Sequence, residues 1–164
     1  MPTETEQVIV NDGSVFFVCI LKRVRRMPIE IKYLDNGIGF GLTVLQDLTG
    51  DKLLDAVKKF YLSEESLRKN KYGLVDYTPV GDIRVSVQDI SVIAELTRQA
   101  SKIAPDRIVA VVASEDASFG LSRMWEMLSG ESSWEKMVFR SRDDAEEWLK
   151  KRVSEKFNIN ITLS

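Results

Sequence analysis

The run RIVAVVA, at residues 107–113, consists of one arginine followed only by apolar residues. A strand with one face in water alternates apolar and polar side chains, whereas a strand that is covered on both faces is apolar throughout. We therefore predict that this run is a central strand of a sheet, with other chain segments packed on both of its faces.

Four segments with helical spacing lie around this strand in the chain. Their apolar stripes are Leu53, Leu54, Val57, Phe60 and Tyr61; Ile90, Ile93, Ala94, Thr97 and Ala100; Leu121, Met124, Trp125 and Leu128; and Ala145, Trp148, Leu149 and Val153. Stripes of this kind are typical of amphipathic helices that pack on a core. Between them, YGLVDY (72–77) and KMVFR (136–140) have the length and composition of short strands.

An antiparallel hairpin is predicted at the start of this pattern. IEIKYLD (29–35) and IGFGLTVL (38–45) both alternate, and Asn36-Gly37 between them favours a tight turn with positive φ at both residues. Phe40, Leu42 and Val44 would then point inward, together with Ile38. Gly39 and Gly41 would fall on the opposite face, where they allow another segment to approach closely.

The predicted order is hairpin, helix, strand, helix, strand, helix, strand, helix. Strands that are joined through helices pair in parallel, by right-handed crossovers. The prediction is an α/β fold: a mostly parallel β-sheet with an initial antiparallel hairpin and helices packed on it. We place this domain at residues 27–153 and a C-terminal tail at residues 154–164.

Residues 1–26 are patterned differently and are predicted to form an N-terminal arm. VIVNDGSVFFVCIL (8–21) suits a hairpin with its turn at residues 11–13. The basic residues of KRVRR (22–26) follow this apolar run, whereas those of a secretory signal would precede it. Two interpretations stay open: a hairpin added to the domain, or a segment upstream of a natural start at Met27.

Composition narrows the classes of function. The chain has 164 residues, of which 44% are hydrophobic and 29% charged, as in an ordinary soluble domain. A net charge of −2 gives no overall attraction to nucleic acid or to anionic membranes. No segment approaches the roughly 20 apolar residues that span a bilayer.

The chemistry that the chain lacks is equally informative. There is no histidine, which removes Ser-His-Asp triads and most zinc sites. The single cysteine, Cys19, precludes an intrachain disulfide and fits a reducing cytoplasm. There is no Walker-type or dinucleotide-binding glycine motif. The sequence therefore favours a non-enzymatic protein without a cofactor or a metal ion.

Three pieces of the sequence resemble the SpoIIAA-like fold, over residues 27–153. They are the initial hairpin, the strand that ends at Asp76, and the closing GLSRMWEML (120–128) with KMVFRSRDDAEEWLKK (136–151). That fold includes the STAS domains (sulfate transporter and anti-sigma factor antagonist), and a more distant relative is the CRAL-TRIO lipid-binding domain. The resemblance implies a non-catalytic regulatory module that contacts a partner protein or a second copy of the chain. The alternative is a small-molecule or lipid-binding domain with a pocket between helices and sheet.

Ser86 is a candidate phosphorylation site on the same resemblance. In typical STAS antagonists, a strand ending in Asp leads to Asp-Ser-Ser-Gly at the head of a helix, and the first serine is phosphorylated. Asp76 and Val80 fit this lead-in, but RVSVQDI (84–90) offers only Ser86 and no following glycine. The residues themselves favour a helix cap, because Asp89 stands three residues after Ser86.

A candidate anion-binding segment, ASEDASFGLSR (113–123), follows the central strand. Ligands of open α/β sheets bind at the carboxyl ends of strands, where helix N-termini present free N–H groups. The candidate residues are Ser114, Ser118 and Gly120, with Arg123 as the counter-charge. The alternative is a plain polar turn and helix cap, which the acidic residues at positions 115 and 116 favour.

A candidate contact surface lies in the next helix and the loop after it. Met127 falls off the stripe of this helix, and Trp134 lies beyond its end in a polar connection. Methionine adapts to irregular surfaces, and tryptophan is enriched at the centres of interfaces. We therefore predict Phe119, Met127 and Trp134 as contacts with a partner or a second copy. The alternative is that the loop folds back and Trp134 covers the end of the core.

Overall fold

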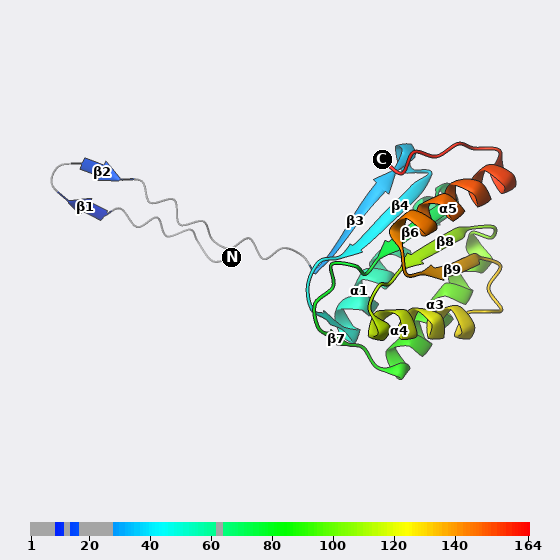
Figure 1. Cartoon of the computed structure of the whole chain (residues 1–164), viewed down its shortest axis with the longest axis horizontal. Helices are drawn as coiled ribbons and strands as arrows, with labels where there is room; N and C mark the ends of the chain where they lie inside the picture. Colours follow the sequence, from blue (N-terminus) through cyan, green and yellow to red (C-terminus); the bar gives the residue numbers. More distant parts are fainter. Residues whose placement is uncertain (1–8, 12–13, 17–27, 62–63) are drawn as a thin grey trace.

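The computed structural model describes residues 9–11, 14–16, 28–61 and 64–164, and it is built on a five-stranded sheet in the order β3-β4-β6-β8-β9 (Figure 1). β3 (Ile29–Leu34) and β4 (Gly39–Val44) pair antiparallel. β6 (Tyr72–Asp76), β8 (Ile108–Val112) and β9 (Glu135–Phe139) continue the sheet in parallel with β4. The predicted α/β class, with its initial hairpin and parallel remainder, is confirmed.

Helices cover both faces of this sheet (Figure 1). α1 (Gly50–Tyr61), α3 (Val87–Ile103) and α4 (Asp116–Leu128) lie on one face, because the strands follow chain order and successive right-handed crossovers stay on one side. α5 (Arg142–Phe157) follows the last strand and packs on the opposite face, against β6, β8 and β9. The short α2 (Glu64–Lys69) leads from α1 to β6.

Two smaller elements complete the domain. β5 (Leu48–Thr49) and β7 (Ile83–Arg84) pair in parallel as a separate ribbon. The 3-10 turn η1 (Asp35–Gly37) joins β3 to β4, and φ is 47° at Asp35, 58° at Asn36 and 83° at Gly37. The expected positive φ values at Asn36 and Gly37 are therefore present. The loop is longer than a two-residue turn, since pairing stops at Leu34 and resumes at Gly39.

Two strand glycines, Gly39 on β4 and Gly73 on β6, make room for aromatic rings of the neighbouring strand. Gly39 pairs with Tyr72, and a β-carbon at Gly39 would overlap the Tyr72 ring. Gly73 pairs with Phe40, and a β-carbon there would overlap the Phe40 ring. The close approach expected at Gly39 is thus made by a ring of the adjacent strand, and each ring lies on a different face of the sheet.

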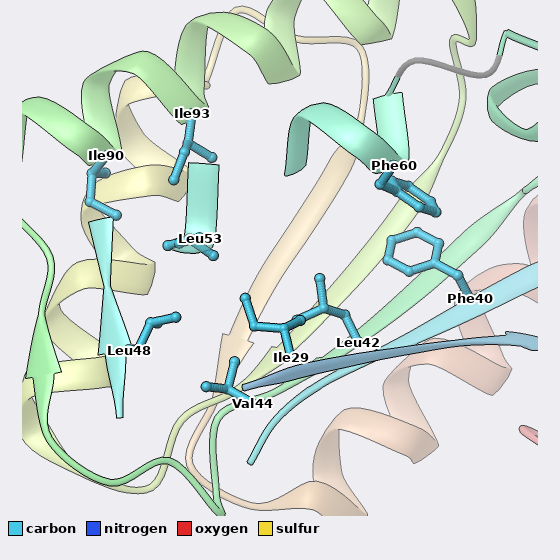
Figure 2. Packing of buried hydrophobic residues seen from close by; sticks show 9 residues of the cluster. All are labelled: Ile29, Phe40, Leu42, Val44, Leu48, Leu53, Phe60, Ile90 and Ile93. Carbon is cyan, nitrogen blue, oxygen red and sulfur yellow. The ribbon is translucent and has the colours of Figure 1, made fainter. Parts of the chain in front are cut away.

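The core has two sides. Phe40, Leu42 and Val44 of β4 face α1 and α3, as Figure 2 shows for their packing toward Leu53, Phe60, Ile90 and Ile93. Tyr72, Leu74 and the alternate residues of β8 face α5. All five residues of β8 are buried, as the unbroken apolar run predicted. Ile38, expected to point inward with Phe40, packs on the α5 side because it precedes the strand.

The chain ends are described in part. β1 (Ile9–Asn11) and β2 (Ser14–Phe16) pair antiparallel, within the stretch where the sequence suggests a hairpin. Outside the described residues lie positions 12–13 of the predicted turn, Cys19, the basic run 22–26 and Met27.

The C-terminal segment belongs to the domain rather than forming a separate tail. α5 runs past the expected boundary to Phe157, and Ile161 is buried beside it. The backbone and hydroxyl of Thr162 donate to Asp35 in the turn between β3 and β4, at 3.1 and 2.6 Å.

Candidate functional site

An apolar cavity of about 90 Å³ lies between the sheet and the three helices α1, α3 and α4. Its walls include Phe40, Leu42 and Val111 from the sheet and Leu53, Ile93 and Leu121 from the helices. In Figure 2, Leu53, Ile90 and Ile93 point from their helices toward the sheet, and Phe60 faces Phe40. The space arises where the apolar stripes of three different helices meet.

The cavity follows the direction of the parallel strands. Phe40 and Val109 mark one level of the sheet, and Leu42, Val75 and Val111 mark the next level. Tyr77, which follows β6 by one residue, lies a further level toward the carboxyl ends of the strands. Four residues of strand separate the level of Phe40 from the level of Tyr77. At a rise of ~3.3 Å per residue, this is about 13 Å along the strands. The lining of the cavity therefore extends over several residues along the strands.

Two phenol groups line this space. Burial raises the pKa of Tyr77 to about 12, and the neighbouring Tyr61 adds to the effect. Burial also raises the pKa of Tyr61, against smaller opposing effects of Thr97 and Arg107. Both side chains are neutral near pH 7, so each offers an O–H group but no charge.

The other polar groups of the lining are mostly used within the protein. The Trp125 indole N–H donates to the Thr97 hydroxyl at 3.0 Å. The Ser118 hydroxyl donates to the Glu115 carbonyl at 3.0 Å. The cavity thus presents an apolar surface with few polar groups to a ligand.

A buried arginine lies behind three aromatic rings of the cavity wall, near the start of the strands. Arg107 directly precedes β8 and is only 1% exposed. The centre of its guanidinium lies 4.5 Å from the Trp134 ring and 5.6 Å from the rings of Phe40 and Phe60, all three of which line the cavity. Its Nη2 donates to the Leu67 carbonyl at 2.7 Å.

Two other nitrogens of Arg107 have no hydrogen-bond partner among the described residues. Nε and Nη1 are buried without a hydrogen-bond acceptor, and no ion pair of Arg107 is seen among the described residues. Burial lowers the pKa of Arg107 to about 10, and the nearby Tyr61 opposes this slightly. The side chain is therefore still a cation near pH 7, although it is out of contact with water.

Ser86 is placed as predicted for a helix cap. Its hydroxyl accepts from the Asp89 backbone N–H at 3.1 Å, and the Asp89 carboxylate accepts from the Ser86 backbone N–H at 2.8 Å. This capping box begins α3, and its hydrogen bonds from Ser86 lower the pKa of Asp89. The hydroxyl is exposed at the surface, and its phosphorylation stays a prediction.

The candidate anion-binding residues are spread around the start of α4. Ser114 and Gly120 are exposed, whereas Ser118 is buried and donates to Glu115 within the turn. Arg123 forms an ion pair with Glu126 of the same helix. The arginine beside Ser114 is Arg140 at the end of β9, which the sequence did not single out.

Arg140 makes three contacts at this edge of the sheet. It donates to the Ser114 carbonyl at 2.8 Å and pairs with Asp116 at 2.8 Å. Its guanidinium also lies 4.0 Å from the centre of the Phe119 ring. These contacts tie the N-terminus of α4 to the end of β9.

The prediction that Trp134 contacts a partner or a second copy is wrong. Trp134 is 4% exposed, and its indole N–H donates to the Ala104 carbonyl at 2.7 Å. The loop folds back and Trp134 covers the end of the core, because the ring packs edge-on against Tyr61 and lies over Arg107. Phe119 is half-buried, whereas Met127 is 72% exposed and stays a candidate for a protein contact.

The acidic residues near the STAS-like lead-in have separate partners. Asp76 is buried and accepts from the Thr78 backbone and hydroxyl, at 2.8 and 2.6 Å, and from Arg142 at 2.7 Å. Asp82 pairs with Arg84, and Asp89 serves the cap of α3. Within the described ranges, no group of three or more acidic or cysteine side chains could hold a metal ion.

Sequence reasoning missed Arg107 as a site residue. The one available signal was its position, since a charged residue stood directly before a strand that was predicted to be buried on both faces. Its aromatic neighbours come from β4, α1 and the loop before β9, and no local pattern connects these segments.

Comparison with known proteins found no family model, no curated protein and no solved structure that matches this chain. In the part of the chain that the structure describes, no helix has the length and apolar character needed to span a membrane.

Proposed function

We propose that this domain is a non-catalytic binding module that takes up a small apolar ligand between the sheet and helices α1, α3 and α4. The observation that supports it is the cavity of about 90 Å³ with its apolar walls. Protein interiors are close-packed, and unfilled apolar space lowers stability because its walls lose dispersion contacts. A ligand that fills the space restores these contacts.

The size of the cavity limits the ligand. An engineered cavity of about 150 Å³ takes up benzene, so the present space suits something smaller or narrower than a ring. Its extension along the strands favours a short unbranched chain that lies between Phe40 and Tyr77. This is the small-molecule form of the alternative that the SpoIIAA-like resemblance implies, and we propose it in place of a large lipid.

The two faces of the sheet provide an internal control for the test. The full chain is titrated with butan-1-ol, hexan-1-ol and octan-1-ol, and methyl signals are followed by NMR. We expect saturable shifts at Leu53, Ile93 and Leu121, which line the cavity. Leu149 and Val153, on the α5 face, should not move. Shifts that never saturate, or that are equal on both faces, would refute the proposed binding site.

A protein-interaction module is the second candidate, and exposed apolar side chains on the helical layer support it. Met127 and Leu128 at the end of α4 are 72% and 40% exposed, and Val92 on the neighbouring α3 is exposed as well. Exposed methionine is typical of surfaces that adapt to partners. We propose that this surface contacts either a second copy of the chain or a partner protein.

The matched control for this surface is a second exposed methionine. Met127→Glu is expected to reduce self-association, measured as molecular mass in solution, without lowering the melting temperature. Met137→Glu changes the 40%-exposed methionine of β9 and should leave the mass unchanged. If the wild-type protein is monomeric at all concentrations, the surface does not bind a second copy of the chain. A different partner protein is then the remaining candidate.

A further inference from the structure

Arg107 is the largest fully buried side chain among the described residues, and its charge has no carboxylate partner there. Buried charges in proteins are normally paired, because removing an ion from water is unfavourable. Here one carbonyl and three aromatic rings face the guanidinium. Cation–π contacts compensate part of the lost hydration, but they leave Nε and Nη1 without acceptors.

Packing alone does not account for an arginine at this position. A methionine or leucine would fill space among the rings of Phe40, Phe60 and Trp134 without burying a cation. The orphaned donors therefore indicate a missing acceptor, and the positive charge indicates that the acceptor is an anion.

The cavity shows where this anion would come from. All three rings that surround the guanidinium also line the cavity, at the end opposite to Tyr77. Arg107 itself is not part of the lining, so an apolar chain in the cavity ends at these rings, and its end group reaches the guanidinium by passing between them. We propose that the ligand is a short unbranched carboxylate, whose chain lies along the sheet and whose carboxylate accepts hydrogen bonds from the free donors of Arg107.

A single negative charge fits this site better than a phosphate ester. One guanidinium balances one charge, and the other polar groups of the lining include two neutral phenols and hydroxyl or indole groups already bound within the protein. A dianionic phosphate would need further donors or cations. This inference rests on the proposed function, since it names the chemical class of the ligand that the cavity holds.

The test compares ligands that differ only in charge. Butanoate, hexanoate and octanoate are titrated into the full chain at neutral pH, each beside the alcohol of equal chain length. We expect the best carboxylate to bind at least about tenfold more tightly than its alcohol, because a charge-assisted hydrogen bond replaces a neutral one.

Two arginine variants test whether Arg107 causes the preference for the carboxylate over the alcohol. Arg107→Met should remove the preference for the carboxylate while the alcohol still binds. Arg140→Met is the control, since Arg140 also lies on an aromatic ring but stands at the other edge of the sheet, beside Ser114. It should keep the full preference.

The outcomes separate the two proposals. If the alcohols bind in the cavity and no carboxylate binds more tightly, the carboxylate inference is overturned and the proposed function stands. If neither class binds, both are overturned. An unchanged preference in Arg107→Met also overturns the inference. Should that variant fail to fold, hexanoate is compared with hexanamide on the wild-type protein, and equal affinities would reject the role of Arg107.

Discussion

The two faces of the sheet are closed in different ways. On one face, the single helix α5 packs against β6, β8 and β9, and Leu149, Val153 and Ala145 are fully buried there. On the other face, α1, α3 and α4 together leave a cavity and enclose a cation. More helices therefore cover the face that holds the cavity.

The side chains explain this difference. Ala110 on β8 and Ala145 on α5 are fully buried, and such small residues let α5 lie close to the strands. The opposite face carries larger residues from three separate helices, whose stripes must all meet over Leu42 and Val111. We infer that the α5 face stabilises the fold and that the face with the cavity is free to bind a ligand.

The largest expected effect tests this division. Leu149→Ala should lower the free energy of unfolding by about 3–5 kcal/mol, because it opens a void in a filled layer. Leu53→Ala, beside the existing cavity, should cost only about 2–3 kcal/mol, since its side chain has fewer packed neighbours. Urea unfolding measures both. An equal or greater loss for Leu53→Ala would remove the proposed difference between the faces.

Adjacent residues of β8 sharpen the comparison, because they point to opposite faces. Ala110→Val adds volume on the filled side and should destabilise by about 1–3 kcal/mol. Val111→Ile adds one methylene beside the cavity and should be neutral or stabilise by up to ~0.8 kcal/mol. Thermal unfolding of the two variants checks the signs, and a shared sign would contradict the assignment of filled and unfilled faces.

The cap at Ser86 begins α3, and this helix forms one wall of the cavity. Ser86→Ala should destabilise by ~1 kcal/mol, and Ser86→Asn should be nearly neutral because Asn also caps helices. Ser86→Asp should be worse than Asn, since the Ser86 hydroxyl lies 2.7 Å from the Asp89 carboxylate and a second charge there would be repelled. Chemical denaturation ranks the three variants. Equal stability of all of them, with phosphate on Ser86 in cells, would favour the switch over the cap.

The smallest expected effect is at the turn that holds the C-terminal segment on the α5 side. Burial by itself raises the pKa of Asp35, but hydrogen bonds from Thr162, Tyr72 and Leu163 outweigh it and hold the pKa below the ordinary value of 3.8. A lowered carboxylate pKa contributes stability that is complete above 3.8 and is lost as the pH falls below it.

Acid should therefore release the last residues before the domain unfolds. Hydrogen exchange of the Leu163 amide, measured from about pH 5 down to about pH 2, should show protection that falls as Asp35 takes up a proton. Asp35→Asn should show the weakened protection already near neutral pH. Protection that does not depend on pH in the wild type would exclude this role of Asp35.

The sequence by itself determined the local structure and the fold class. The apolar run at 107–113 predicted a strand covered on both faces, and the helical stripes predicted most of the helix residues that pack on the core. The exception is Leu128 of the α4 stripe, which is 40% exposed. Asn36-Gly37 predicted a turn with positive φ, and Ser86 with Asp89 predicted the cap of α3. Each of these features depends on residues that are close in the chain, so their spacing is sufficient to reveal them.

Only the tertiary structure decided what lies between these elements. Trp134 gave no periodic signal and is buried because the loop before β9 folds over Tyr61. The surroundings of Arg107 combine residues 40, 60, 67 and 134, and the cavity is the space left when three helices settle on one sheet. Periodicity states which face of an element is buried, but it does not state which distant side chains meet there or how completely they fill the space.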